Sequence, residues 1–272
     1  MRTKDHRNRM KRTQDLKDHI IKYWDKAGLC SFDSSTCAGD PYLASCDNFI
    51  ESCLLEELIE KECPKDGSGI DIGAGLGRFT VVLARHLNLV HSLEAAKNIY
   101  YKLADNCAEF SNVKTFNIDF ESFNTNEDYN IAVVSGLLYL YPDNMVHEFF
   151  EKLVNHLKPG GVVVIRDFIV KKGVEEVPSS YIEEGFCYYR DSRYWKTVAK
   201  SFNLRLTEVF QSKPSYPFKR LLWLYSKLGL MRIFSVNIIK KMLYRNVKVK
   251  KERGVIDFSS EIQTVFIVMQ KE

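Results

Sequence analysis

The sequence predicts an α/β fold, a doubly wound and mostly parallel seven-stranded sheet whose last strand is antiparallel. Three observations lead to this prediction. Short apolar segments alternate with helical ones from residue 68 onward, a glycine-rich turn follows the first apolar segment, and the last segments lose the alternation. With 272 residues, of which 45% are hydrophobic, the chain is long enough to bury a substantial core.

The expected strands and helices follow from these patterns in order. The strands are expected at 68–72, 89–93, 113–118, 130–135 and 161–168, and the helices between them at 77–87, 95–109 and 143–157. Two more strands are expected at 203–210 and 261–270. They lack the helical crossover pattern that is typical of the other strands, which indicates an antiparallel end to the sheet. Residues 13–26 and 42–61 are expected as helices, with a Ser, Asp and Gly-rich loop at 31–41 between them.

We therefore expect four parts in the chain. They are an N-terminal helical cap at 1–60, a ligand-binding core at 61–212, a basic and apolar insertion at 213–258, and the final core strand at 259–272. Because the insertion precedes the last strand, it is expected at the carboxyl edge of the sheet, where it would form a lid over a bound substrate.

Positive charge is concentrated in two segments. Residues 213–253 hold twelve Lys or Arg against Glu252 alone, and residues 1–26 hold nine Lys or Arg against four Asp, although the net charge is only +4. Basic appendages on an acidic core indicate an anionic partner. This partner is an anionic substrate, a nucleic acid or a membrane surface. The mixture of large apolar and basic residues in 213–253 favours peripheral membrane contact, and its other interpretation is a lid packed on the core.

The turn after the first expected strand has an unusual composition. It runs from Gly73 to Gly77, includes Ala74 and Gly75, and is preceded by Asp71. Glycines there permit a sharp turn and close approach of a ligand to the backbone. The spacing G-x-G-x-G differs from the G-x-G-x-x-G of dinucleotide folds, and a carboxylate at 71 would repel a pyrophosphate. A ligand that carries an ammonium group suits the site, so the loop favours S-adenosylmethionine over NAD.

Further side chains at the ends of expected strands complete this ligand site. Glu94 ends the second strand, where a carboxylate accepts hydrogen bonds from ribose hydroxyls. Asp119 follows the third strand and is placed to accept from an adenine amino group, with Phe120 against the ring. Ser135 and Tyr139 follow the fourth strand and are expected to face the reacting centre.

These pieces resemble one known family. Residues 60–210 are similar to the class I, Rossmann-like S-adenosylmethionine-dependent methyltransferases in "DIGAGLG", in Glu94, in "IDF" at 118–120 and in "LKPGGVVVIRDF". The segment 261–270 resembles that fold's antiparallel seventh strand. The resemblance implies that the glycine loop contacts the methionine part of the cofactor, that the second acid holds the ribose and that the third binds adenine.

Methyl transfer from a sulfonium requires alignment and exclusion of water more than activation of a leaving group. No metal site is expected, because the chain has no C-x-x-C and no H-x-x-x-H spacing. Asp167, which follows an arginine at the end of the fifth strand, is the first candidate for a base or a substrate-orienting group. Tyr139 and the stretch "CYYRDSRYW", with Tyr189 and Arg190, are the next candidates.

The methyl acceptor stays open between several classes. We favour an N or O atom of an anionic small molecule, glycan or lipid-linked substrate, because of the basic insertion. The run "PDNMVHEFFEKLVNHLKPGGVVVIRDF" resembles tRNA 3-methylcytidine methyltransferases, in which the basic arms would contact phosphates. The loop "IDIGAGLGRFT" resembles protein N-terminal methyltransferases, but Leu140 stands where that family has a histidine. The remaining alternative is a non-catalytic partner subunit with the same fold.

The sequence also carries signals of location. It shows no signal-peptide pattern, and no uninterrupted apolar run approaches the roughly 18–20 residues that span a bilayer. The seven cysteines are an odd number and indicate reduced thiols. A cytoplasmic protein is therefore expected.

Overall fold

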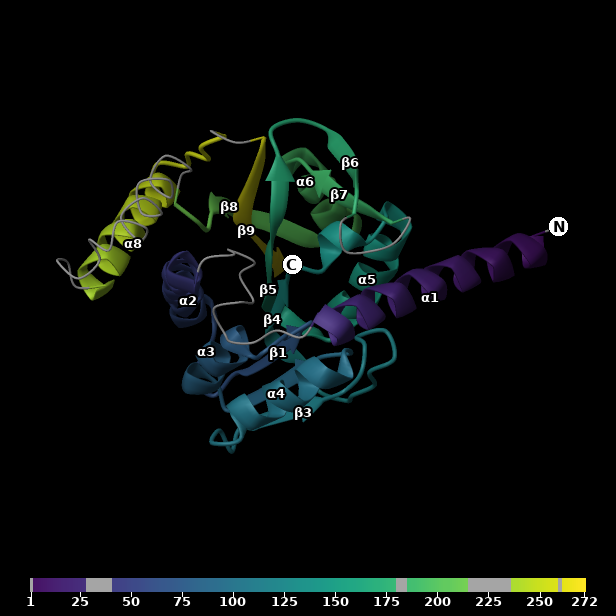
Figure 1. Cartoon of the computed structure of the whole chain (residues 1–272), viewed down its shortest axis with the longest axis horizontal. Helices are drawn as coiled ribbons and strands as arrows, with labels where there is room; N and C mark the ends of the chain where they lie inside the picture. Colours follow the sequence, from purple (N-terminus) through teal and green to yellow (C-terminus); the bar gives the residue numbers. More distant parts are fainter. Residues whose placement is uncertain (1, 28–40, 180–184, 215–235, 259–260) are drawn as a thin grey trace.

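The computed structural model describes residues 2–27, 41–179, 185–214, 236–258 and 261–272, and its helices lie on both faces of one sheet (Figure 1). The strands are β1 (Ser68–Ile72), β2 (Leu89–Leu93), β3 (Val113–Phe116), β4 (Tyr129–Ser135), β5 (Leu157–Val170), β6 (Val174–Pro178), β7 (Phe186–Arg190), β8 (Leu204–Gln211) and β9 (Ile262–Lys271). The helices are α1 (Arg2–Ala27), α2 (Pro41–Glu62), α3 (Arg78–His86), α4 (Lys97–Cys107), α5 (Asp143–Asn155), α6 (Ser192–Ser201) and α8 (Val236–Glu252), and a 3-10 turn spans Leu138–Leu140.

The sheet is mostly parallel and its last strand is antiparallel, as the sequence predicts. Its order is β3-β2-β1-β4-β5-β7-β6, with β9 beside β5 and β8 beside β9. Strands β1 to β5 pair in parallel, and β9 runs antiparallel to β5. The α/β fold with an antiparallel final strand is thereby confirmed.

Among the described residues the sheet has nine strands, two more than the seven expected. The additional strands, β6 and β7, pair antiparallel with each other, and Ile169 of β5 pairs with Arg190 of β7. All five residues of β6 are exposed. A strand without a buried face lacks the apolar run from which the other strands were recognised, which explains why the sequence did not predict it.

Two apolar cores lie on opposite faces of the sheet. Side chains of α2, α3 and α8 pack on one face, and those of α5 and α6 on the other. Strand β5 contributes to both, because its side chains alternate: Val162 and Val164 point to the α2 face, whereas Val163 and Ile165 point to the α5 face. This alternation also decides where the polar residues at the end of β5 point.

Part of the expected domain plan falls outside the described residues. The loop expected at 31–41 lies outside them, apart from its last residue, and so does the middle of the insertion expected at 213–258. The main described element of this insertion is α8. Within the described part of the chain, none of the helices has the length and apolar character needed to cross a membrane.

Candidate functional site

The loop between β1 and α3 forms the floor of a cavity at the carboxyl ends of the parallel strands. Gly73 and Gly75 have φ angles of 69° and 58°, a left-handed conformation that favours glycine. Gly77 has a different role: a Cβ there would lie 2.7 Å from Leu103 Cδ1, so its bare backbone lets α3 approach α4. Gly73, Ala74 and Gly75 line the cavity, whereas Gly77 does not.

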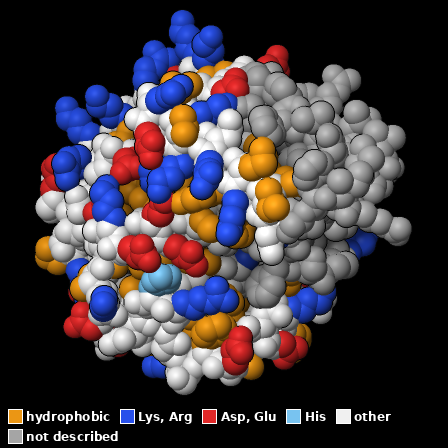
Figure 2. Space-filling view, turned by 90° about the vertical axis from the view of Figure 1, so that its left-hand side faces the viewer, with side chains coloured by type: hydrophobic (Ala, Val, Ile, Leu, Met, Phe, Trp, Pro, Cys, Tyr) orange, Lys and Arg blue, Asp and Glu red, His pale blue; other side chains and the backbone are white. Residues whose placement is uncertain are grey.

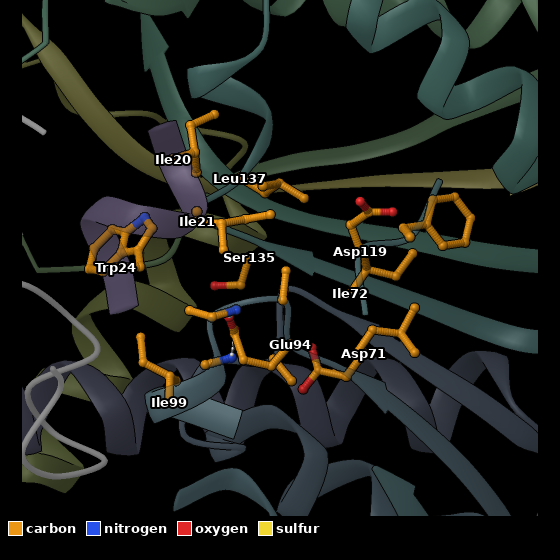
Figure 3. Close-up of a pocket in the computed structure, with 18 of the residues that line it drawn as sticks. Ile20, Ile21, Trp24, Asp71, Ile72, Glu94, Ile99, Asp119, Ser135 and Leu137 are labelled. Carbon is orange, nitrogen blue, oxygen red and sulfur yellow. Dashed lines mark hydrogen bonds between the residues drawn. The ribbon is translucent and has the colours of Figure 1, made fainter. Parts of the chain in front are cut away.

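Glu94 connects this loop to the end of β2. Its Oε2 accepts a hydrogen bond from the Gly75 amide at 2.9 Å, and its Oε1 accepts one from the Ala96 amide at 2.8 Å. Burial raises the pKa of Glu94 to about 7 even though both amides favour the charged form. The carboxylate lies at the cavity wall, where it is labelled in Figure 3.

Asp71 lies under the loop and is almost completely buried. Its Oδ2 accepts a hydrogen bond from Thr80 Oγ1 at 2.7 Å, and Thr80 Oγ1 accepts one from Ser92 Oγ at 2.9 Å. Burial raises the pKa of Asp71 to about 6, against the Thr80 hydrogen bond and the charge of Arg78. Its Oδ1 has no hydrogen-bond partner among the described residues, so one acceptor oxygen is available at the cavity.

The other predicted ligand residues also reach the cavity. Strand β3 ends at Phe116, so Asp119 lies in the turn beyond it, where its Oδ1 accepts from the Ser122 amide at 2.6 Å. Asp119, Phe120 and Ser135 line the same cavity as the glycine loop. The topology therefore brings together the ends of β1, β2, β3 and β4 in one site of about 160 Å³.

Helix α1, which belongs to the segment 1–60 expected as an N-terminal helical cap, covers this cavity. Lys17, Ile20, Ile21 and Trp24 contribute to the lining, and Figure 3 shows Ile20, Ile21 and Trp24 opposite Glu94 and Ile99. Two contacts hold the helix in place: the Asn98 amide donates to Asp25 Oδ1 at 2.6 Å, and Lys17 Nζ lies 3.2 Å from Glu121 Oε1. The apolar side of 13–26 was visible in the sequence, but the surface that it would cover was not.

Aromatic rings form the wall at the ends of β4 and β5. The rings of Tyr139 and Phe168, which both line the cavity, meet edge to face with centroids 5.0 Å apart. Tyr189 of β7 stacks parallel to Tyr139, with centroids 6.2 Å apart. Tyr141 also lines the cavity, and burial raises its pKa well above the ordinary tyrosine value. The wall is therefore aromatic and largely shielded from water.

Two buried arginines share one carboxylate beside the glycine loop. Arg166 Nε donates to Glu51 Oε1 at 2.9 Å, and Arg78 Nη2 lies 2.8 Å from Glu51 Oε2. Burial alone would raise the pKa of Glu51, but the charges of Arg166 and Arg78 hold it well below its usual range. Arg78 Nη1 and Arg166 Nη2 are buried without a hydrogen-bond partner among the described residues, and both side chains line the cavity. Sequence reasoning missed this cluster because Glu51 lies on a distant helix.

Asp167 and Arg190, two of the predicted catalytic residues, do not line the cavity. Alternation along β5 places Arg166 and Phe168 at the cavity and Asp167 on the other side of the strand. Asp167 Oδ1 accepts from the Phe168 amide at 2.9 Å, and burial raises the pKa of Asp167 to about 7. Tyr139, the third predicted residue, is in the lining.

Arg190 is almost completely buried behind the Tyr139 turn. It donates to the Leu138 carbonyl at 3.0 Å, to the Tyr141 carbonyl at 2.5 Å and to Asp143 Oδ1 at 2.9 Å. These contacts fix the turn that presents Tyr139 and Tyr141. In this geometry Arg190 positions the aromatic wall and does not touch the cavity.

Within the described part of the chain, no group of three His, Cys, Asp or Glu side chains could hold a metal ion. The cavity is instead suited to an organic ligand: it has backbone exposed by glycines, one free carboxylate oxygen, two free guanidinium donors and an aromatic wall.

Comparisons with known proteins agree with this description. A family model described as AdoMet dependent proline di-methyltransferase matches residues 13–219. The fold is similar to a SAM-dependent methyltransferase from Leishmania major, with a TM-score of 0.61 at 15% identity over 93% of this chain and 82% of that one. No curated protein sequence matches significantly.

Two other solved structures share the fold at similarly low identity. A putative sarcosine dimethylglycine methyltransferase from Galdieria sulphuraria is 16% identical, with a TM-score of 0.54 over 82% of this chain and 84% of that one. An O-methyltransferase from Brevibacillus brevis, solved with S-adenosyl-L-homocysteine, is 16% identical, with a TM-score of 0.54 over 80% of this chain and 71% of that one.

Proposed function

The chain belongs to the AdoMet dependent proline di-methyltransferase family and is an S-adenosylmethionine-dependent methyltransferase, and we propose that its acceptor is an amine nitrogen of the proline type. One observation carries the choice of an amine. The wall of the cavity beyond the glycine loop is formed by the rings of Tyr139 and Phe168. Aromatic faces attract cations. The sulfonium of the cofactor is present before transfer to an amine, and the methylated ammonium is present after it.

The residues of the cavity fit the cofactor. Glu94 and Asp119 both line the cavity, and in this proposal Glu94 accepts hydrogen bonds from ribose hydroxyls and Asp119 from the adenine amino group. The unpartnered Asp71 Oδ1 and Arg78 Nη1 offer an acceptor for an ammonium and a donor for a carboxylate, the two charged groups of a methionine moiety. S-adenosylmethionine supplies an electrophilic methyl group on a sulfonium.

This chain's own residues then have the task of alignment and exclusion of water. Trp24 and Ile21 of α1 cover the cavity, and Tyr139 and Phe168 bound it on the acceptor side. An amine attacks only in its neutral form, so it must lose a proton before transfer. Leu140, at the position where the resemblance would place a histidine, is buried and lies outside the lining. We therefore propose that the acceptor enters as a free amine, without a histidine base.

A second candidate acceptor has an observation of its own. Arg166 brings a buried positive charge and an unpartnered Nη2 to the cavity beside Phe168. Such a donor suits a carboxylate or phosphate, so an anionic small molecule or lipid-linked acceptor is the alternative. The lid role expected for 213–258 and the catalytic role expected for Asp167 remain predictions under either candidate.

The test uses purified protein, S-adenosylmethionine and acceptor peptides, with methyl addition followed by mass spectrometry. A peptide with an N-terminal proline is compared with its N-acetylated form, which has no basic nitrogen. We expect methylation of the first peptide only, and a rate that rises with pH as the amine, with a pKa near about 8, becomes neutral.

Phe168→Leu provides a matched variant. It keeps an apolar side chain but removes the ring, so we expect lower turnover of the amine with unchanged affinity for S-adenosylhomocysteine. Equal methylation of the acetylated peptide, or transfer only to carboxylate or phosphate acceptors that is lost in Arg166→Met, would reject the amine in favour of the second candidate. Cofactor binding without transfer to any acceptor would indicate the non-catalytic subunit instead.

A further inference from the structure

Helix α8 presents an unusual face to solvent. It lies on the side of the molecule seen in Figure 2, where Lys and Arg side chains gather with hydrophobic side chains between them. The helix holds six Lys or Arg and a single acid, Glu252. Its sequence therefore combines strong positive charge with several large apolar residues.

The inner face of α8 is firmly attached to the rest of the protein. Leu243 and Val247 are buried in the core that α2 and α3 form with the sheet. Lys248 Nζ donates to Glu57 Oε1 at 2.5 Å, and Lys251 Nζ lies 3.6 Å from Glu208 Oε2. These contacts fix the rotation of the helix about its axis, so its outer face has a defined composition.

Apolar side chains occupy the outer face. Ile238, Met242 and Val249 are 53%, 57% and 42% exposed, and their spacing of four and seven residues places them in one stripe along the helix. A helix of a soluble domain ordinarily has polar residues opposite its buried side. A stripe of this kind marks a surface that is covered by something else.

Basic side chains run along one edge of the stripe. Lys241 and Arg245 are exposed, and neither forms an ion pair within the described part of the chain. We propose that α8 is an interfacial helix that docks this protein on an anionic phospholipid bilayer. Ile238, Met242 and Val249 would enter the boundary between head groups and acyl chains, while Lys241 and Arg245 would meet the lipid phosphates.

The composition of the face argues against two other occupants. Single-stranded nucleic acids stack their bases on aromatic rings, but the aromatic side chain of α8, Tyr244, is half-buried and hydrogen-bonded to Glu57. A second copy of this chain would set Lys241 and Arg245 against the same charges, which disfavours a symmetric pair. An anionic lipid surface suits both the apolar stripe and its basic edge. The proposal does not depend on the nature of the methyl acceptor.

The experiment is co-sedimentation of the full chain with phosphatidylcholine vesicles, with and without phosphatidylserine, at low and high salt. We expect binding only with phosphatidylserine, weakened by salt. Arg245→Glu and Met242→Ser should each weaken the partition coefficient by about fivefold or more, because one removes a cation and the other an apolar anchor. Lys200→Glu, an exposed charge reversal on α6, is the matched control and should leave binding unchanged.

Circular dichroism of each variant verifies that it is folded, and methylation of a soluble acceptor separates docking from catalysis, since the α8 variants should retain it. Equal binding to vesicles without phosphatidylserine, insensitivity to Met242→Ser, or equal losses in the α6 control would overturn the proposal. Tight binding to a transfer RNA without vesicle binding would also overturn it and assign the face to nucleic acid.

Discussion

Glu51 of α2 accepts a hydrogen bond from Arg166 Nε of β5 at 2.9 Å, although 115 residues separate them in the chain. The same carboxylate also pairs with Arg78 and accepts a hydrogen bond from Ser212 Oγ at 2.8 Å. One buried acid from the N-terminal helices thus pairs with both arginines of the cavity. This contact connects the helix before the core to the cavity.

Neutralising Glu51 should therefore be costly. Glu51→Gln removes the carboxylate that both buried guanidinium groups contact, and we expect the free energy of unfolding to fall by about 3–5 kcal/mol. The measurement is urea denaturation at pH 7. Glu60→Gln, an exposed position on the same helix, is the control and should change stability by less than about 0.5 kcal/mol. Equal stability of the two variants would show that the ion cluster is not needed for folding.

Glu94→Gln should weaken cofactor binding. The amide nitrogen of glutamine cannot accept the hydrogen bond that Gly75 or Ala96 now donates, and it would face one of these backbone donors. We expect the affinity for S-adenosylhomocysteine, measured by isothermal titration calorimetry, to fall about tenfold or more. Glu148→Gln, at an exposed position on α5, is the matched control. An undiminished affinity in Glu94→Gln would place the ribose elsewhere.

Stability should depend on pH through the buried carboxyl groups. Burial raises the pKa of Asp167 to about 7, so the folded state holds a proton there that the unfolded chain releases near pH 4. The stabilisation from this proton is complete below about pH 4 and is lost as the pH rises through about 7. Asp167→Asn removes this titration, so its stability relative to the natural protein should be greater at pH 8 than at pH 5, by on the order of 2 kcal/mol.

Denaturation of the cofactor-free protein at both pH values provides this comparison. Asp105→Asn, an exposed change on α4, should show no such pH-dependent difference. If Asp167→Asn behaved like Asp105→Asn, Asp167 would be ionised in the folded protein at pH 5.

Arg190→Lys distinguishes a positioning role from a catalytic one. Lysine cannot keep the hydrogen bonds to Leu138, Tyr141 and Asp143 at once, so we expect a loss of about 2–4 kcal/mol in the free energy of unfolding together with a lower kcat. The affinity for S-adenosylhomocysteine should stay unchanged. Arg193→Lys, whose side chain is 69% exposed, is the control. A loss of kcat at unchanged stability would instead indicate that Arg190 touches the reacting groups.

The sequence by itself determined the fold class and the cofactor. Both depend on local patterns: buried parallel strands appear as short apolar runs, and a backbone that must turn sharply under a ligand requires glycine, as at Gly73 and Gly75. Because the carboxyl ends of parallel strands meet at one edge, the order along the chain was sufficient to bring Glu94 and Asp119 to the same cavity. The exposed strand β6 left no such pattern and was not predicted.

Only the tertiary structure decided which neighbouring side chains face the cavity and which distant ones join it. Alternation along β5 puts Arg166 and Phe168 at the site and Asp167 behind it, and a shift of one residue would exchange them. The contact of Glu51 with Arg166, and the cover that Trp24 provides, arise between segments far apart in sequence. No local pattern encodes such contacts, because they depend on how whole helices pack on the sheet.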